Sequence, residues 1–311
     1  MISVDIKSSP SLYFDYREGL KLLNSIKEED YSYPEKVTYF HVYTEVRTSK
    51  ELMAIKSYLA TQNLEKTKLI VWSDYDISDQ ENIQPFKDLV TFRVYSPREL
   101  SIGTPLEGIE THLTTGGDQN HWMSSGVMRF LVLYQFGGVY FDMDMILLRD
   151  FKPILGQDFA YQWGGSTDFA KERRTEPDCH GPCAAMLGVT NGGDYINACI
   201  RRLAITPPTG GTCYDEDMMG YVYQTTPFTV FPSTFFDTEW LVSKVDEPLS
   251  QELEKSRIEH EIKDHKNLFL DAFAWHWHNS SNKNKEVVAG SKFDLLTKFI
   301  NKKLKDRGLN D

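Results

Sequence analysis

The sequence predicts an α/β protein with a mostly parallel central sheet flanked by helices. Short apolar segments rich in β-branched and aromatic residues alternate with longer segments whose apolar residues recur at helical spacing. Strands that alternate with helices form βαβ units, and these units pair their strands in parallel. The chain has 311 residues, of which 41% are hydrophobic and 25% charged. A chain of this length and composition can bury a large core without disulfides or structural metals.

The first half of the chain supplies the clearest elements, after a polar lead-in at residues 1–36. In order, we expect a short helix around Tyr16–Lys27, a strand at Val37–Tyr43, a helix at Ser49–Thr61, strands at Lys68–Ser73 and Leu89–Tyr95, a long helix at Asp118–Phe136 and a strand at Val139–Phe141. In the second of these helices, Leu52, Ile55 and Leu59 form one apolar stripe. Gly137 and Gly138 predict a left-handed stop to the long helix.

The second half of the chain shows a looser pattern. We expect strands at Phe159–Trp163, Ala184–Val189 and Phe228–Phe231, helices at Tyr195–Leu203 and Phe293–Lys305, and an aromatic, histidine-rich segment at Asp271–His278. Regular elements resume on both sides of the Pro- and Gly-rich stretch 206–211, which is therefore a loop and not a linker. The chain is predicted to be a single domain, 1–311.

The charge balance excludes one class of partner. The 34 Lys and Arg residues against 45 Asp and Glu residues give a net charge of −11, which disfavours a nucleic acid, because phosphate neutralisation needs a basic stripe. The basic exception is Ser281–Asp311, with eight Lys and Arg against four acidic residues. We interpret it as one solvated face of a terminal helix; a site for an anionic membrane or polyanionic acceptor is the alternative.

The sequence favours a cytoplasmic setting. No apolar run is long enough for a transmembrane segment, and the first residues, MISVDIKSSP, lack the signature of a signal peptide. The four cysteines, Cys179, Cys183, Cys199 and Cys213, are few for this length and indicate free thiols. A zinc site at Cys179, Cys183 and Cys213 is disfavoured, because the spacing is irregular and no fourth ligand is evident.

Two carboxylates follow the predicted strand Val139–Phe141. Asp142 and Asp144 are two residues apart, so in an extended backbone both side chains point the same way and can face one ion. Carboxylate oxygens suit magnesium or manganese, which takes one or two carboxylates together with substrate phosphates. Open α/β sheets bind ligands at the carboxyl ends of their strands. A nucleoside diphosphate would complete such a shell.

The segment Ser125–Asp144 reads Ser-Gly-Val-Met-Arg-Phe-Leu-Val-Leu-Tyr-Gln-Phe-Gly-Gly-Val-Tyr-Phe-Asp-Met-Asp. It resembles the pattern Ser-Asp-x-x-Arg-Tyr-x-x-Leu-Tyr-x-x-Gly-Gly-x-Tyr-x-Asp-x-Asp of the glycosyltransferases whose sugar-binding region contains the DXD motif. That family includes yeast-type mannosyltransferases and, more distantly, the clostridial glucosylating toxins. The resemblance implies a GT-A, Rossmann-like fold with a nucleotide-sugar-binding half at 37–150. Residues 151–311 would then form the acceptor-side half and the C-terminal helix.

The resemblance also implies roles for individual residues. Asp144 would ligate the divalent cation, Mn or Mg, together with the diphosphate. Asp142 would lie near the donor's ribose and sugar and contact the metal directly or through water. Arg129 would reach the donor from its helix; the alternative is an Arg paired with a surface Glu.

The sequence departs from the family pattern at Gly126. The family usually has an Asp at this position, three residues before the Arg, where it helps to hold the donor sugar. That contact is therefore missing or comes from elsewhere, and Ser125, Asp118 and Gln119 are the candidates.

Two aromatic residues close the first two predicted strands. Tyr43 is our candidate for stacking on the nucleobase, because relatives have an aromatic residue at the end of this strand. A packed core tyrosine is an equal alternative. Trp72 closes the second strand and is expected in the core.

The late segment Trp275-His276-Trp277-His278 is another candidate for the site. In a strand the two histidines share one face and the two tryptophans the other. The family tends to carry a His- and Trp-containing segment near its C-terminus, so we expect His276 or His278 to be a further metal or phosphate ligand. The alternative is an aromatic patch at a sheet edge with one hydrogen-bonded histidine.

A general base for the acceptor hydroxyl is required only if the enzyme inverts the anomeric centre. Asp215 or Asp217 could serve, and Asp217 is our candidate for catalysis beside Asp142 and Asp144. A solvated acidic turn is the alternative for this segment.

Together these features predict a metal-dependent glycosyltransferase. It would move a sugar from a nucleotide-sugar donor, a UDP- or GDP-sugar, to a glycan, glycoconjugate or other hydroxyl acceptor. Two alternatives are a catalytically inactive relative that binds nucleotide sugars or carbohydrates, and a haloacid-dehalogenase-like phosphotransferase with an Asp nucleophile.

Overall fold

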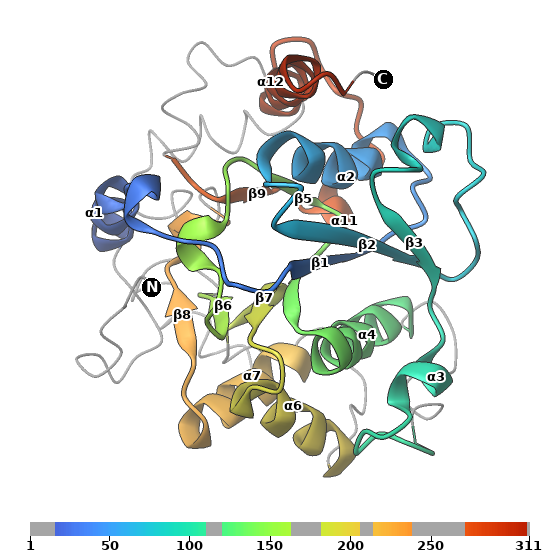
Figure 1. Ribbon diagram of the computed structural model, residues 1–311, viewed down its shortest axis with the longest axis vertical. Helices are drawn as coiled ribbons and strands as arrows, with labels where there is room; N and C mark the ends of the chain where they lie inside the picture. The colour runs from blue at the N-terminus through green and yellow to red at the C-terminus, as the bar shows by residue number, and fades with distance from the viewer. Residues whose placement is uncertain (1–15, 110–119, 163–181, 206–213, 238–270, 310–311) are drawn as a thin grey trace.

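A seven-stranded sheet crosses the molecule, with helices on both of its faces (Figure 1). The computed structural model describes residues 16–109, 120–162, 182–205, 214–237 and 271–309. The strands of this sheet are β1 (Thr38–Tyr43), β2 (Thr67–Ser73), β3 (Thr91–Val94), β4 (Gly138–Phe141), β6 (Phe159–Tyr161), β7 (Cys183–Val189) and β8 (Thr229–Phe231). The described helices are α1 (Tyr16–Ser25), α2 (Ser49–Thr61), α3 (Pro97–Ser101), α4 (Asn120–Phe136), α6 (Asp194–Ile205), α7 (Tyr214–Thr225), α11 (Asn279–Asn282) and α12 (Lys292–Asp306).

The strand order β3-β2-β1-β4-β7-β6-β8 makes the sheet mostly parallel. Strand β1 pairs in parallel with β2 and β4, β2 with β3, and β6 with β8. Strand β7 is antiparallel to both of its neighbours, β4 and β6. Since β7 alone is reversed among these seven strands, the carboxyl ends of the other six lie at one edge of the sheet. The predicted α/β class is confirmed.

Helix α2 is buried on most of its circumference. The predicted stripe of Leu52, Ile55 and Leu59 is buried, but so are Ser57 and Tyr58 on other faces. The reason is that α2 contacts α12 as well as the strand that follows Asp144, so it lies inside the molecule (Figure 1). One apolar stripe predicts a surface helix, and here tertiary packing buries polar positions as well.

The opposite face of the sheet is covered by α4, α6 and α7 (Figure 1). Helix α7 was not among the predicted elements, because its acidic start, Asp215-Glu216-Asp217, suggested a solvated turn. That interpretation is wrong for the backbone: acidic residues are favourable in the first turn of a helix. The apolar residues that anchor this helix are Met219 and Val222.

The junction between α4 and β4 depends on two glycines. Gly137 and Gly138 have φ angles of 64° and 94°, the left-handed conformation that ends the helix as predicted. The Gly137 N–H still donates to the Leu133 carbonyl at 2.8 Å. A Cβ at Gly138 would lie 1.9 Å from the carbonyl oxygen of Tyr39 on the neighbouring strand β1. Only glycine therefore fits where β4 joins the sheet.

A second, two-stranded sheet was not predicted. Strands β5 (Met145–Leu147) and β9 (Ala274–His276) pair antiparallel, with Met145 opposite His276. This pairing of β5 with β9 (Figure 1) brings the aromatic, histidine-rich segment beside the residues that follow β4, although the two are far apart in the sequence.

Two basic residues of the C-terminal segment, Lys292 and Arg307, make contacts inside the molecule. Lys292 is buried, with its ammonium 4.9 Å from the ring centroid of Trp275. Arg307 donates to the carbonyls of Leu59 and Gln62 at 2.6 and 2.7 Å, at the end of α2. These contacts anchor α12 and leave fewer charges for a docking surface. Within the described ranges, every helix is too short or too polar to cross a lipid bilayer.

Candidate functional site

The two carboxylates of the Asp-x-Asp segment lie where β4 ends, at the edge of the sheet that holds the other carboxyl ends. The Asp142 N–H donates to the Ala185 carbonyl of β7 at 2.8 Å, which continues the sheet pairing. The Met145 N–H then donates to the Asp142 carbonyl at 3.0 Å and closes a turn. The expected extended backbone through Asp144 is therefore wrong, because the chain must turn here to enter β5. The two side chains consequently have different partners.

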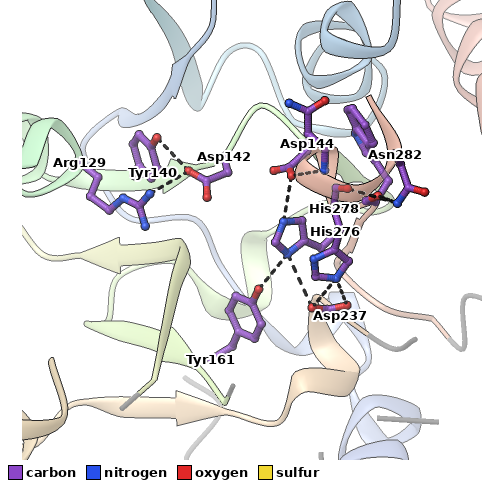
Figure 2. Close-up of polar contacts among 11 residues, drawn as sticks. Arg129, Tyr140, Asp142, Asp144, Tyr161, Asp237, His276, His278 and Asn282 are labelled. Atoms are coloured by element: carbon purple, nitrogen blue, oxygen red, sulfur yellow. Dashed lines mark hydrogen bonds and ion pairs between the residues drawn. The ribbon is translucent and has the colours of Figure 1, made fainter. Parts of the chain in front are cut away.

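Asp142 is held by a cation and a hydroxyl (Figure 2). Its Oδ1 accepts from the guanidinium of Arg129 at 3.2 Å and from the hydroxyl of Tyr140 at 3.0 Å. The Arg129 guanidinium also lies 5.2 Å from the ring centroid of Tyr140. Asp142 keeps 26% of its side chain exposed, against 8% for Arg129. The carboxylate can therefore reach a ligand, and the guanidinium beneath it orients it.

The other end of the Arg129 guanidinium binds Asp215. The nitrogen Nη1 donates to Asp215 Oδ2 at 3.0 Å, and the two side chains are 8% and 9% exposed. This pair connects α4 to the first turn of α7. It overturns the alternative that Arg129 pairs with a surface Glu, and it shows Asp215 to be a buried ion-pair partner and not a solvated residue.

Asp144 contacts the late histidine segment (Figure 2). Its Oδ2 lies 3.2 Å from His276 Nε2 and accepts the backbone N–H of Asn279 at 2.8 Å. The backbone carbonyl of Asp144 accepts the N–H of Trp277 at 3.0 Å. The side chain of Asp144 is 14% exposed, so it is recessed below Asp142 but still open to one side.

Behind His276 lies a second buried carboxylate, Asp237, which the sequence analysis did not identify. It is fully buried, and its Oδ2 lies 3.1 Å from His278 Nε2 and 3.6 Å from His276 Nδ1. The rings of His276 and His278 stack at a centroid distance of 3.9 Å. The Tyr161 hydroxyl lies 3.3 Å from His276 Nδ1 (Figure 2). The expectation that both histidines share one side is confirmed, although only His276 is in a strand.

The pKa values of these groups depart from their ordinary values in opposite directions. Burial raises the pKa of Asp142 to about 6, although Arg129 opposes the rise. Burial alone would raise the pKa of Asp144, but the neighbouring His276 lowers it to about 2. Burial would likewise lower the pKa of His276, but Asp144 and then Asp237 raise it to about 10. The site therefore favours a positive charge between Asp144 and Asp237.

The donor set fits a divalent cation. Asp144 Oδ2 and His276 Nε2 lie 3.2 Å apart, close to the ~3 Å between neighbouring ligands of a six-coordinate ion with ~2.1 Å bonds. One carboxylate with one imidazole suits a divalent transition metal such as manganese. Single donor atoms of Asp237, His276 and His278 also lie within 4.8 Å of one another, so this trio is a second candidate set. Both sets include His276.

Tyr43 and Trp72 lie at the carboxyl ends of β1 and β2. The Tyr43 hydroxyl donates to Asp74 at 2.5 Å, and its ring meets the ring of Tyr95 edge-on at 5.9 Å. Its side chain is only partly buried, so nucleobase stacking stays a prediction. Trp72 is 2% exposed and donates to His41 Nδ1 at 3.2 Å, which confirms it as a core residue.

The structure places the remaining predicted site residues only in part. Ser125 is half-buried on α4, one helical turn before Arg129. Asp217 belongs to α7, but its side chain lies outside the described part of the structure. Four residues lie wholly outside the described ranges: Asp118, Gln119, Cys179 and Cys213. The buried thiols of Cys183 and Cys199 form no disulfide within those ranges.

Sequence reasoning missed the position of Asp237 and the link between Asp215 and Arg129. Asp237 follows the aromatic pair Phe235-Phe236 in no recognisable motif, and its contacts are long-range. For Asp215 a signal existed, because an acidic residue in the first turn of an amphipathic helix can reach a cation on the neighbouring helix.

A comparison with known protein families matches the part of the chain that carries Asp142 and Asp144. Residues 49–160 match the family model described as "Glycosyltransferase sugar-binding region containing DXD motif", a span that includes β4, Asp142 and Asp144. No curated protein matches the sequence.

Several solved structures match the chain at low identity. The glycosyltransferase structure of WbbM matches with a TM-score of 0.50 and 13% identity, over 89% of this chain and 52% of that one. The apo form of GlyE from Streptococcus pneumoniae TIGR4 gives 0.48 and 11%, over 89% and 65%. The structure titled "PaToxG Glycosyltransferase" gives 0.45 and 15%, over 68% and 79%. The chain thus spans less than two thirds of the WbbM and GlyE structures. The WbbM likeness supports the predicted GT-A, Rossmann-like fold.

Proposed function

We propose that the chain is a metal-dependent glycosyltransferase, because residues 49–160 match the DXD-motif sugar-binding region. The enzyme would transfer a sugar from a UDP- or GDP-sugar to a hydroxyl of a glycan or glycoconjugate. One observation carries the proposal. Asp144 and His276, from opposite halves of the chain, lie 3.2 Å apart at the edge of the sheet where Asp142 remains accessible.

Asp144 and His276 are the residues that would hold the divalent cation, Mn or Mg. The bound cation would supply Lewis-acid stabilisation of the diphosphate leaving group. The Asn279 N–H and the pairing of β5 with β9 hold Asp144 and His276 together before any ligand binds. Of the two histidines expected at the metal, His276 is the better candidate, because His278 Nε2 faces Asp237.

Asp142 would contact the ribose and the transferred sugar of the donor. Arg129 and Tyr140 both hold Oδ1, which leaves the other carboxylate oxygen as the acceptor for donor hydroxyls. Because the guanidinium is buried, its contribution to donor binding would come through Asp142. Ser125 is the other candidate on α4 for a donor contact.

The nucleoside would extend along the carboxyl ends of β1 and β2 toward Tyr43. Tyr43 and Tyr95 form an aromatic corner there, and Asp74 orients the Tyr43 hydroxyl. Stacking of a base on an aromatic ring is favourable for every base, so this corner would not by itself select uracil over guanine.

In the transfer step, the bond between the anomeric carbon and the diphosphate oxygen breaks, and the acceptor oxygen bonds to that carbon. The acceptor proton would pass to a general base if the enzyme inverts. Asp217 is the candidate on α7, because Asp215 is committed to Arg129.

A thermal-shift screen of UDP-, GDP- and TDP-sugars, with and without manganese, tests the binding part of this proposal. A ligand that binds only the native state raises Tm, so we expect one nucleotide class to stabilise the protein in the presence of manganese. No shift with any donor would contradict the proposal.

Release of nucleoside diphosphate tests turnover. We expect release by the wild type, no release by Asp144→Ala or Asp142→Asn, and folded protein in both variants. Binding without release would identify a carbohydrate-binding relative. Hydrolysis of a generic aryl phosphate would support the phosphotransferase alternative, which the match at 49–160 disfavours.

A further inference from the structure

Asp237 is a buried carboxylate near this site that the proposed reaction does not use. It is 0% exposed, and its backbone N–H donates to the Ser233 carbonyl at 2.6 Å, just after the short 3-10 helix Ser233–Phe235. A buried carboxylate is retained only where cations or donors compensate it. The compensating groups here are the two imidazoles, His276 and His278.

The oxygens of Asp237 have different surroundings. Oδ1 pairs with His278 Nε2 at 3.2 Å. Oδ2 is buried and lies 3.1 Å from the same nitrogen of His278 and 3.6 Å from His276 Nδ1. The 3.6 Å between Oδ2 and His276 Nδ1 is long for a hydrogen bond, and hydrogen bonds in unliganded sites often shorten only when the ligand binds.

His276 thus has a different carboxylate at each ring nitrogen. Nε2 lies 3.2 Å from Asp144, the proposed metal ligand, and Nδ1 points toward Asp237. Histidines that ligate metals almost always donate their other ring N–H to a carboxylate, carbonyl or water. That outer hydrogen bond fixes the tautomer and the ring orientation and makes the ligating nitrogen more basic.

We infer that Asp237 is a positioning residue for the cation site: it accepts the Nδ1 proton of His276 and so presents the Nε2 lone pair to a divalent cation shared with Asp144. The inference rests on the proposed function. Asp237 itself makes no contact with the metal or the donor.

His278 braces this arrangement. Its backbone has a φ of 53°, a left-handed conformation that ends β9 and lets its ring stack on that of His276. Its Nε2 lies 3.2 Å from Oδ1 and 3.1 Å from Oδ2 of Asp237, so it fixes the carboxylate whose Oδ2 also lies near His276 Nδ1. Two competing arrangements exist. The Tyr161 hydroxyl could be the main partner of Nδ1, or Asp237 and both histidines could ligate the metal directly.

Manganese binding to the purified protein, followed by the EPR signal of free Mn²⁺, measures the effect without activity. We expect Asp237→Asn to weaken the affinity about 10- to 100-fold while one site is retained. The matched control is Asp158→Asn. Asp158 accepts the backbone N–H of Thr190, but it lies before β6, at the opposite edge of the sheet from Asp144. This control should bind manganese like the wild type.

Three outcomes would overturn the inference. Unchanged affinity in Asp237→Asn rejects it, and a loss in Tyr161→Phe alone assigns Nδ1 to Tyr161. Pulsed EPR of the manganese-loaded wild type should detect one coordinating imidazole, and two would mean that His278 is a direct ligand. The last measurement needs no variant, so it applies even if Asp237→Asn fails to fold. Absence of manganese binding by the wild type would instead reject the metal in the proposed function.

Discussion

Replacing Asp215 by Asn tests the ion pair that joins α4 to α7. Arg129 Nη1 and Asp215 Oδ2 are 3.0 Å apart, and both side chains are less than a tenth exposed. Removing one partner of a buried pair costs about 3–5 kcal/mol, because a buried charge is left uncompensated. Arg129 retains Asp142 at 3.2 Å, so we expect the lower end, about 3 kcal/mol.

Thermal unfolding gives the readout. For 311 residues the unfolding entropy is about 0.65 kcal/mol per kelvin, so 3 kcal/mol corresponds to a Tm lower by about 5 °C. The matched control is Asp79→Asn. Asp79 lies 2.9 Å from Lys87, a comparable distance, but the two side chains are 90% and 44% exposed. Exposed pairs contribute little to stability, so the control should melt with the wild type.

Asp215→Asn should also weaken binding of the nucleotide-sugar donor. Without Asp215 the guanidinium of Arg129 loses one of its two carboxylate partners and orients Asp142 less firmly, so KM for the nucleotide sugar should rise more than kcat falls. Equal Tm values for Asp215→Asn and Asp79→Asn would refute the argument, because burial would then make no difference to the pair.

Three further changes have defined outcomes. Gly138→Ala should yield little folded protein by circular dichroism, since its Cβ would lie 1.9 Å from a backbone oxygen; near-native unfolding would contradict the tight β1–β4 contact. Burial lowers the pKa of His41 from 6.5 to about 4, so between these values only the unfolded chain binds the proton. The free energy of unfolding should therefore fall by about 3 kcal/mol as the pH drops from 6.5 to 4, and His41→Gln should flatten urea-measured stability across that window. Arg307→Gln should lower Tm through loss of the contacts to the Leu59 and Gln62 carbonyls, whereas Lys302→Gln on the same helix should not.

The elements that the sequence predicted well have strong local signals. Helix α2 begins and ends at the predicted residues, Ser49 and Thr61, and the Thr48 side chain caps it by accepting from the Glu51 N–H. The end of α4 follows from the two glycines, whose conformation no other residue adopts easily. The predicted bounds of the long strands agree with the structure within one or two residues, because these segments too have strong local signals.

The parts that were missed depend on distant contacts. Strands β5 and β9 have three residues each, too few to show an alternating pattern, and their pairing joins Met145 to His276. The turn at Asp142 follows from that pairing, so it could not be predicted from two carboxylates in a row. The resemblance predicts Asp142, Asp144 and Arg129 as site residues, but their buried partners are visible only once the chain is folded.

The most direct test of the account is a crystal of the protein grown with manganese and a nucleoside diphosphate, with anomalous data collected near the manganese edge. The account predicts one strong anomalous peak in contact with Asp144 Oδ2 and His276 Nε2 and with the diphosphate. A bound nucleotide with no peak there, or a peak that contacts neither residue, would contradict it.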